Sequence, residues 1–327
     1  MDDVGGGSVQ EAQTNKLKNA IGKIFILSSF RVARFPRLFD AMLGSRQLMK
    51  SGNTRSAAVC AILFVGVAFA LDRTLPHAFH EYPGIEYRIG TIPLPPDYEE
   101  KTEWAFARMM FPGGWLDGYQ GRELDWHTGV SLWTQDFPRA DRHFSLAVRR
   151  LTRIHVRSVE QPVNLDDGDD VYNWPWIYAV QVGEWGITDE QAKKLRDYLL
   201  RGGFFMADDF HGTQEWSVFQ ESMQRVFPDR KIVDIPDADA VFHTVYDLDE
   251  RYQIVGYEHL GEGHKKDGYV ARWRGIYDDK HRLLVLASFN SDIGDSWEWA
   301  DSPDYPERYS ALGIRIGINN IVYAMTH

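Results

Sequence analysis

Acidic side chains follow three short apolar runs of the sequence, at Trp176–Val182, Phe204–Ala207 and Leu283–Ser288. Such runs are typical of buried strands. If the three strands are neighbours in a parallel sheet, their carboxyl ends meet at one edge, where ligands of open α/β sheets bind. We therefore predict one acidic site there. Its candidate ligand-binding residues are Glu184, Trp185, Asp208, Asp209, His211, Asp292, Asp295 and Trp297.

Four of these residues are aspartates that could hold a metal ion or act as acid and base. Oxygen ligands suit the divalent cations calcium, magnesium and manganese. Paired carboxylates also perform acid–base work in glycoside hydrolysis. A structural alternative is that aspartates at strand ends cap the next helix, and Asp209 would then accept the amides of Gly212 and Thr213. The tentative metal ligands are Asp208, Asp209, Asp292 and Asp295.

The stretch Phe289–Pro306, FNSDIGDSWEWADSPDYP, places an acid at every third position. A three-residue period lines up on one face of a polyproline-type segment, and Pro303 and Pro306 favour an extended path. We expect the first half of the stretch to join the site and the second half to lie in a solvated turn or at a helix start. The five acids are Asp292, Asp295, Glu298, Asp301 and Asp304.

The chain has 11 tryptophans, more than a core needs. Indole faces stack well on sugar rings and on partner proteins, although core packing is the default role of any single tryptophan. Tryptophans beside carboxylates would favour a carbohydrate or another polyol. Those in a loop-like sequence context are Trp115, Trp126, Trp133, Trp185, Trp297 and Trp299.

Other motifs indicate no specific chemistry. The acidic run Asn164–Asp170, NLDDGDD, lacks the ligand order of an EF-hand and reads as a turn around Gly168. The histidines show no HExxH spacing, and neither a phosphate-binding glycine loop nor a GxSxG elbow is present.

Alternating strand-like and helix-like segments predict an α/β fold. Its clearest unit is Trp176–Phe227, where Thr188 and Gln191 form a capping box and Gly202-Gly203 ends the helix before Phe204–Ala207. A strand–helix–strand crossover of this kind makes a parallel sheet.

Further elements follow from local patterns. We expect helices at 139–154, capped by Asp141, at about 213–227, and at 307–325, where Gly313 and Gly317 permit close packing. Residues 231–235 predict a strand. Residues 91–97 and 161–173 predict connections, and 110–115 a helix-terminating turn.

An uncharged apolar run at 56–70 separates the N-terminal part from the rest. Its length and the preceding Arg55 are typical of a secretory leader. We predict an N-terminal extension at 1–48, a signal peptide or membrane anchor at 49–71, a linker at 72–86 and a single α/β domain at 87–327. The domain would then be exported, periplasmic or secreted, or anchored in the inner membrane by residues 56–71.

The net charge of the domain restricts the partners that it can bind. Residues 1–70 carry nine Lys and Arg against four Asp and Glu, so the remainder has a net charge of −16, against −11 for the whole chain. Phosphate backbones and anionic membranes would repel such a domain, so we expect no nucleic-acid partner and membrane contact only through the N-terminal hydrophobic segment. The single cysteine, Cys60, lies in that segment, which leaves the domain without a thiol.

The chain resembles a bacterial family classified as a domain of unknown function in three segments, WTQDFPRADRHFSLAVRRLTRI (133–154), GGFFMADDFHG (202–212) and FNSDIGDSWEWADSPDYP (289–306). The resemblance covers about Tyr87 to His327. It implies a three-layer sandwich with a mostly parallel central sheet, flavodoxin-like and similar to class I glutamine amidotransferases, but no activity. Amidotransferase chemistry needs a cysteine, which the exported part lacks. Looser relatives are trehalose-utilisation-like proteins, compatible with a sugar ligand.

Two hypotheses of function follow. The first is an envelope domain that binds a small polar molecule, such as a carbohydrate, or a partner protein at an acidic, tryptophan-rich rim. The second is a hydrolase, dependent on carboxylates or a metal, that acts on a sugar-like substrate.

Overall fold

A seven-stranded sheet with the order β2-β1-β3-β4-β7-β6-β5 forms the centre of the described protein. The computed structural model describes residues 76–118 and 125–327. The strands from β2 to β7 in this order are parallel, whereas β6 and β5 are antiparallel to their neighbours. Their bounds are β1 Ala107–Met110, β2 Gln161–Asn164, β3 Trp176–Ala179, β4 Phe204–Ala207, β5 Val233–Asp234, β6 Arg272–Tyr277 and β7 Leu283–Phe289.

The predicted α/β class with a mostly parallel sheet is confirmed, and β3, β4 and β7 are adjacent as the site prediction required. All residues of these three strands are buried, which explains their continuous apolar sequences. The prediction of a connection at 161–173 is wrong at its start. Gln161–Asn164 pairs with β1 as an edge strand, although its sequence QPVN is half polar.

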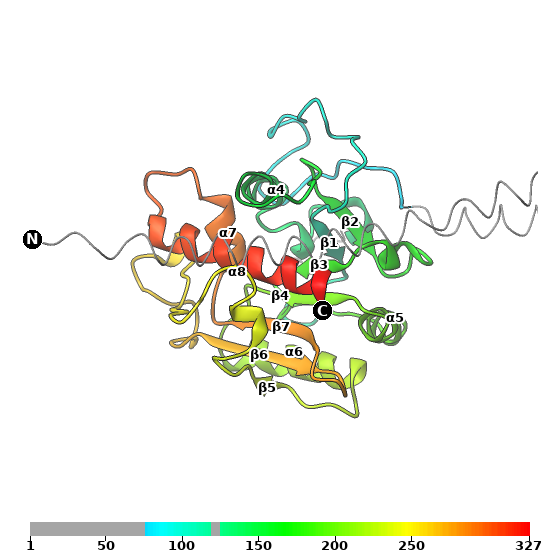
Figure 1. The fold of residues 1–327 in the computed structure, drawn as a ribbon, viewed down its shortest axis with the longest axis vertical. Coiled ribbons are helices and arrows are strands. Elements are labelled where there is room, and N and C mark those ends of the chain that lie inside the picture. The colour runs from blue at the N-terminus through cyan, green and yellow to red at the C-terminus, as the bar shows by residue number, and fades with distance from the viewer. Residues whose placement is uncertain (1–75, 119–124) are drawn as a thin grey trace, which may run out of the picture. The chain divides into compact units, whose positions relative to one another are not determined.

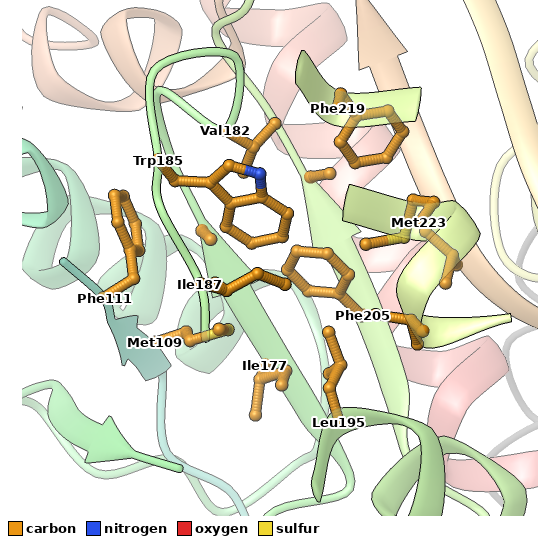
Figure 2. Close-up of a cluster of buried hydrophobic side chains, with 14 of the residues drawn as sticks. Met109, Phe111, Ile177, Val182, Trp185, Ile187, Leu195, Phe205, Phe219 and Met223 are labelled. Carbon is orange, nitrogen blue, oxygen red and sulfur yellow. The ribbon is translucent and has the colours of Figure 1, made fainter. Parts of the chain in front are cut away.

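Helices cover both faces of the sheet, as expected of a three-layer α/β arrangement. Figure 1 shows α4, α7 and α8 grouped together and α5 and α6 apart from them. On the α5–α6 side, Leu195 and Phe219 pack with Phe205 of β4 (Figure 2). On the other side, Trp297 lies 5.3 Å from the ring of Tyr178. The helices are α4 Arg139–Leu151, α5 Asp189–Leu200, α6 Gly212–Val226, α7 Ile293–Glu298 and α8 Glu307–Thr326.

Local sequence signals predicted features of two of these helices correctly. The capping box of α5 is present, with the Gln191 amide donating to Thr188 Oγ1 at 3.1 Å. On α8, a Cβ at Gly313 would collide with Ser296 of α7, so the predicted close packing is confirmed. The prediction that Asp141 caps α4 is wrong, because its carboxylate pairs with the buried Arg108.

The acidic stretch after β7 is helical where a polyproline-type path was expected. Residues Ile293–Glu298 form α7, and Asp292 is its N-cap. The three-residue period therefore places Asp292, Asp295 and Glu298 on one side of a short helix. The predicted turn at 110–115 does not end a helix either, because it follows strand β1.

The predictions for residues 1–75 lie outside the described residues. In the segment 78–86, assigned to the linker, Tyr82 packs against the hydrophobic core and Gly84 donates to the carbonyl of Tyr87. Over the described ranges 76–118 and 125–327, none of the helices has the length and apolar character needed to cross a membrane.

Candidate functional site

Strands β3, β4 and β7 each end in a turn that contains a residue with positive φ. These residues are Gln181 (52°), Asp209 (45°) and Asn290 (64°). Non-glycine residues rarely adopt this conformation, which here turns the chain sharply at the carboxyl edge. Their side chains tie the turns together: Gln181 Nε2 donates to Asp209 Oδ2 at 2.6 Å, and Asn290 Oδ1 accepts the Gly212 amide at 2.9 Å.

Asp208 is buried and fully bonded. Its Oδ2 accepts from the Tyr178 hydroxyl at 2.7 Å and the Gly294 amide at 2.8 Å, and its Oδ1 accepts from Ser288 Oγ and the Ile293 amide. Burial raises the pKa of Asp208 to about 6, against the effect of these donors. Its lone pairs hold the first turn of α7 against β4, which is a structural role.

Asp209 forms a buried ion pair. Its Oδ1 lies 3.0 Å from Lys265 Nζ and 2.9 Å from His211 Nε2. Burial disfavours the charge, but Lys265 and His211 outweigh it and hold the pKa of Asp209 below its usual range. The alternative that Asp209 caps α6 is wrong, because the Gly212 and Thr213 amides donate to Asn290 and Asp267.

His211 is also buried, and burial lowers its pKa. Since the ionised Asp209 can only accept, Nε2 of His211 carries the proton of a neutral ring. Its Nδ1 has no hydrogen-bond partner among the described residues. His211 is thus part of the Asp209 network and not a polar surface residue.

The acids of α7 face the same edge. Asp292 Oδ1 accepts the Asp295 amide at 2.9 Å, and Asp295 Oδ2 accepts the Tyr257 amide at 2.6 Å. The Tyr87 hydroxyl donates to Glu298 Oε1 at 2.5 Å. The carboxyl groups of Asp292 and Asp295 lie against the backbone of Gly256, where a Cβ would be only 2.5 Å from Asp292 Oδ2 and 2.8 Å from Asp295 Oδ2.

Three acids of the site were missing from the predicted site residues: Glu298, which was noted only as part of the acidic stretch, and Asp136 and Glu86. Asp136 lies in the loop before α4 with a φ of 61°, and its amide donates to Glu86 Oε2 at 3.1 Å. Its Oδ2 is buried and accepts from no described residue. The side chain approaches the backbone of α7, where a Cβ at Gly294 would lie 2.2 Å from Asp136 Oδ2. Asp136 belongs to the motif WTQDFP, whereas Glu86 had been assigned to the linker.

Three overlapping groups of potential ligand atoms result, and within each group the atoms lie within 4.8 Å of one another. The groups are Asp209–His211–Asp292, Glu86–Asp136–Glu298 and Asp136–Asp292–Asp295. The first and third groups share Asp292, and the second and third share Asp136. Asp208 and Glu184 belong to none of the groups.

Burial and mutual repulsion raise the pKa of every carboxyl group in the last two groups. Burial and then Asp295 raise the pKa of Asp136 well above its usual range. Burial and then Glu86 raise the pKa of Glu298 to about 9. Asp292 and Asp295 shift in the same direction, with burial as the largest cause. Glu86 does so too, because its carboxyl group is partly desolvated although its side chain as a whole is exposed. We call these five residues, Glu86, Asp136, Asp292, Asp295 and Glu298, the acidic centre.

The tryptophans predicted to line the site face the core. Trp297 is 0% and Trp185 1% exposed. The indole of Trp185 lies among Phe111, Phe205 and Phe219 (Figure 2), and Trp297 stacks on Phe144 at 4.2 Å. A loop-like sequence context did not reveal that their rings fill gaps between sheet and helices. Trp133 is buried too, Trp126 and Trp299 are half-buried, and Trp115 is 68% exposed.

Glu184 lies at the carboxyl edge but away from the acidic centre. Lys266 Nζ donates to its Oε1 at 2.9 Å and also contacts the buried Glu215. The acidic turn at 164–170 is as predicted, with Gly168 at a φ of 61°.

No curated protein matches the chain. A family model described as a domain of unknown function matches residues 126–325, a range that contains Asp136, Asp208 and Asp209 and the whole of α7. Because the match spans more than half of the sequence, the chain belongs to this family, Domain of unknown function (DUF4159).

Proposed function

We propose that the acidic centre binds a hard divalent cation, magnesium, calcium or manganese, and through it a small polar ligand. The observation that carries the proposal is Asp136. Its carboxylate is buried, its Oδ2 has no donor in the described part of the chain, and one of its oxygens lies within 4.8 Å of oxygens of Asp292 and Asp295. An oxygen-only ligand set of this kind suits these cations.

The charge of the centre supports the same proposal. Buried carboxylates that face one another repel unless protons or a cation lie between them. Lys265 acts against the raised pKa values of Asp292 and Asp295, but its ammonium group is paired with Asp209 at 3.0 Å. A divalent cation among Asp136, Asp292 and Asp295 would offset their mutual repulsion and satisfy the free oxygen of Asp136.

Some of the ligand residues predicted from the sequence belong to the proposed cation site. Asp292 and Asp295 are ligands, and Asp209 with His211 lies beside them. Asp208 is left out, since four donors already use its lone pairs. Trp185 and Trp297 are left out as ligand-stacking residues, since both are buried.

Calorimetry and thermal unfolding of the full chain with Mg²⁺, Ca²⁺ and Mn²⁺ test the proposal. A cation at a hundredfold excess over its Kd stabilises the folded state by about 2.7 kcal/mol, so a rise in Tm is expected. Asp136→Asn keeps the shape of the side chain and should abolish both the heat and the rise in Tm. Asp279→Asn, at an exposed aspartate far along the chain, should change neither. Absence of heat and of stabilisation with all three ions would refute the cation site.

A hydrolase is the second candidate function. It is favoured by the opposite pKa shifts of two carboxyl groups at this edge: the pKa of Asp209 lies below its usual range, and that of Glu298 is raised to about 9. Such a pair can divide the roles of base and acid. Assays of the full chain with nitrophenyl glycosides, with and without Mn²⁺, test it. Turnover that survives Asp279→Asn but not Glu298→Gln supports a hydrolase, and absence of turnover leaves the binding function.

The finer fold assignment and the location are also proposals. The parallel strand order β2-β1-β3-β4-β7 matches the 2-1-3-4-5 order of flavodoxin-like sheets and supports a flavodoxin-like, amidotransferase-like domain. Export to the periplasm or beyond, with either a small polar ligand or an envelope protein as partner, rests on the apolar run at 56–70. Cell fractionation with an antibody against the domain tests the location, and a purely cytoplasmic signal would contradict it.

A further inference from the structure

We propose that the acidic centre holds two divalent cations bridged by Asp136. This inference rests on the proposed cation site and adds a second position to it. The first position is Asp136–Asp292–Asp295, and the second is Glu86–Asp136–Glu298. In two-metal sites the ions lie roughly 3.5–4 Å apart, a separation that one carboxylate can bridge.

The two groups of ligands lie side by side because α7 carries one member of each. Asp295 and Glu298 are three residues apart on this helix and therefore face the same side. The carboxyl group of Glu298 is in hydrogen-bonding contact with those of both Asp295 and Glu86. Ionised carboxylates cannot bond to one another, so either protons or cations must lie between them. Two divalent cations would leave five carboxylates with a net charge of about −1.

Neighbouring hydrogen-bond donors orient the ligands of the second position. Glu298 is 2% exposed and accepts from the Tyr87 hydroxyl, which in turn accepts from Arg139 at 3.3 Å. Glu86 is oriented by the Asp136 amide and by the side-chain amide of Gln135. The buried Oδ2 of Asp136, without a donor among the described residues, is the observation that favours a cation between these groups.

The group Asp209–His211–Asp292 is a less suitable second position. Asp209 already accepts from Lys265, His211 and Gln181, so at most one of its lone pairs is left. A cation there would also lie beside the Lys265 ammonium group, 3.0 Å from Asp209 Oδ1. We therefore place the second cation on the side of the centre away from Lys265.

One consequence concerns the segment before the family domain. Glu86 precedes the matched range 126–325, so the second position needs a residue from outside it. Two hydrogen bonds hold the segment in place: the Val130 amide donates to the Pro83 carbonyl at 2.9 Å, and the Ile85 amide donates to Thr134 Oγ1 at 3.2 Å. The second cation would add a link between this segment and α7.

Metal analysis and electron paramagnetic resonance of the full chain with Mn²⁺ test the proposal. The unsubstituted protein should bind two Mn²⁺ per chain and give the signal of an exchange-coupled pair. Glu86→Gln, at an exposed side chain that folding tolerates, should bind one Mn²⁺ and give the signal of an isolated ion. Asp136→Asn should lose the coupling, and Asp279→Asn should behave like the unsubstituted protein. Circular dichroism checks that each variant is folded.

The outcomes separate this inference from the proposed function. One uncoupled Mn²⁺ that depends on Asp292 and Asp295 would overturn the bridged pair and leave the cation site intact. Two Mn²⁺ that are lost in His211→Gln but kept in Glu86→Gln would overturn the assignment of the second position. No bound Mn²⁺ would overturn both.

Discussion

Two buried charged regions lie next to each other in this protein, and they are organised in opposite ways. In the first, Arg108 and Asp141 are fully buried and paired, with Arg108 Nε 2.8 Å from Asp141 Oδ2. Arg108 Nη1 also donates to the carbonyls of Trp133 and Gln135. In the second, Asp136 directly follows Gln135, yet its buried Oδ2 has no donor within the described ranges. The first region satisfies its charges within the chain, whereas in the second the Oδ2 of Asp136 has no partner among the described residues.

The difference suggests a division of labour. Arg108 fixes the loop at 133–135, and that loop presents Asp136 to α7. Asp208 has a similar role on the other side, because it fixes the first turn of α7. Paired buried charges thus position the acidic centre, whose acids are the proposed ligands. Each prediction below tests whether a given charge belongs to the positioning group or to the binding group.

The largest effect is expected for Asp141→Ala. This substitution leaves the Arg108 guanidinium buried without its counter-ion, which costs about 3–5 kcal/mol. Urea unfolding followed by tryptophan fluorescence measures the change in the free energy of unfolding.

A double variant separates pairing from packing. Arg108→Met with Asp141→Leu replaces the ion pair by apolar side chains and should recover most of the lost stability. If Asp141→Ala unfolds at the same urea concentration as the unsubstituted protein, the pair does not hold the loop, and the comparison with the acidic centre fails.

The pH dependence of the cation-free protein is the next largest effect. Burial and then Glu86 raise the pKa of Glu298 from about 4.5 to about 9, so the folded state binds a proton that the unfolded state has released. Stability is therefore full below about pH 4.5 and falls as pH rises through 9. The pKa values of Asp141 and Asp208 are raised to about 6, so their contributions to folding stability are also lost as the pH rises, but at lower pH than that of Glu298. The acidic centre therefore dominates above about pH 6.

Between about pH 6 and pH 9 we expect Glu298 to account for a loss of about 3 kcal/mol, less than the full linkage value because its partner Glu86 is exposed to solvent. Urea unfolding in chelator-treated buffers at several pH values measures it. Glu298→Gln should reduce the dependence but not remove it, because Asp136 and Asp292 also have raised pKa values. Saturating Mg²⁺ should flatten the dependence of the unsubstituted protein. A flat profile without metal would mean that the acids of the centre do not repel one another.

A smaller loss is expected for Asp208→Asn. The amide group cannot accept all four of the hydrogen bonds that hold the first turn of α7, and one unsatisfied buried donor costs about 1–3 kcal/mol. Because α7 carries Asp295 and Glu298, the affinity for Mn²⁺ should fall as well. Calorimetry and unfolding on the same preparation measure the two effects. A loss of affinity with full stability would make Asp208 a ligand instead of a positioning residue.

The sequence predicted the positioning elements better than the acidic centre. Strand β4 and the capping box of α5 were predicted correctly because their signals are local. The adjacency of β3, β4 and β7 followed from the rules for parallel sheets. These elements brought Asp209, Asp292 and Asp295 to one edge.

The rest of the centre depends on contacts between distant segments. Glu86 and Asp136 meet α7 only through the tertiary fold, and no local pattern marks either residue as a ligand. The acidic period after β7 fits a polyproline-type path and a helical one almost equally, and the prolines at 303 and 306 favoured the wrong choice. The burial of Trp185 and Trp297 was likewise decided by the space between layers, which a loop-like context does not reveal.

The smallest effect is expected for Asp279→Asn, the matched control for every aspartate substitution above. Asp279 pairs with Arg230 at 2.9 Å, but its side chain is 89% exposed. Exposed ion pairs contribute little because water and salt screen them and because ordering two side chains costs entropy. Urea unfolding should give the same midpoint as the unsubstituted protein, and Mn²⁺ should bind unchanged. A loss of Mn²⁺ binding here would show that general negative charge attracts the ion, since this aspartate shares only its charge with Asp136.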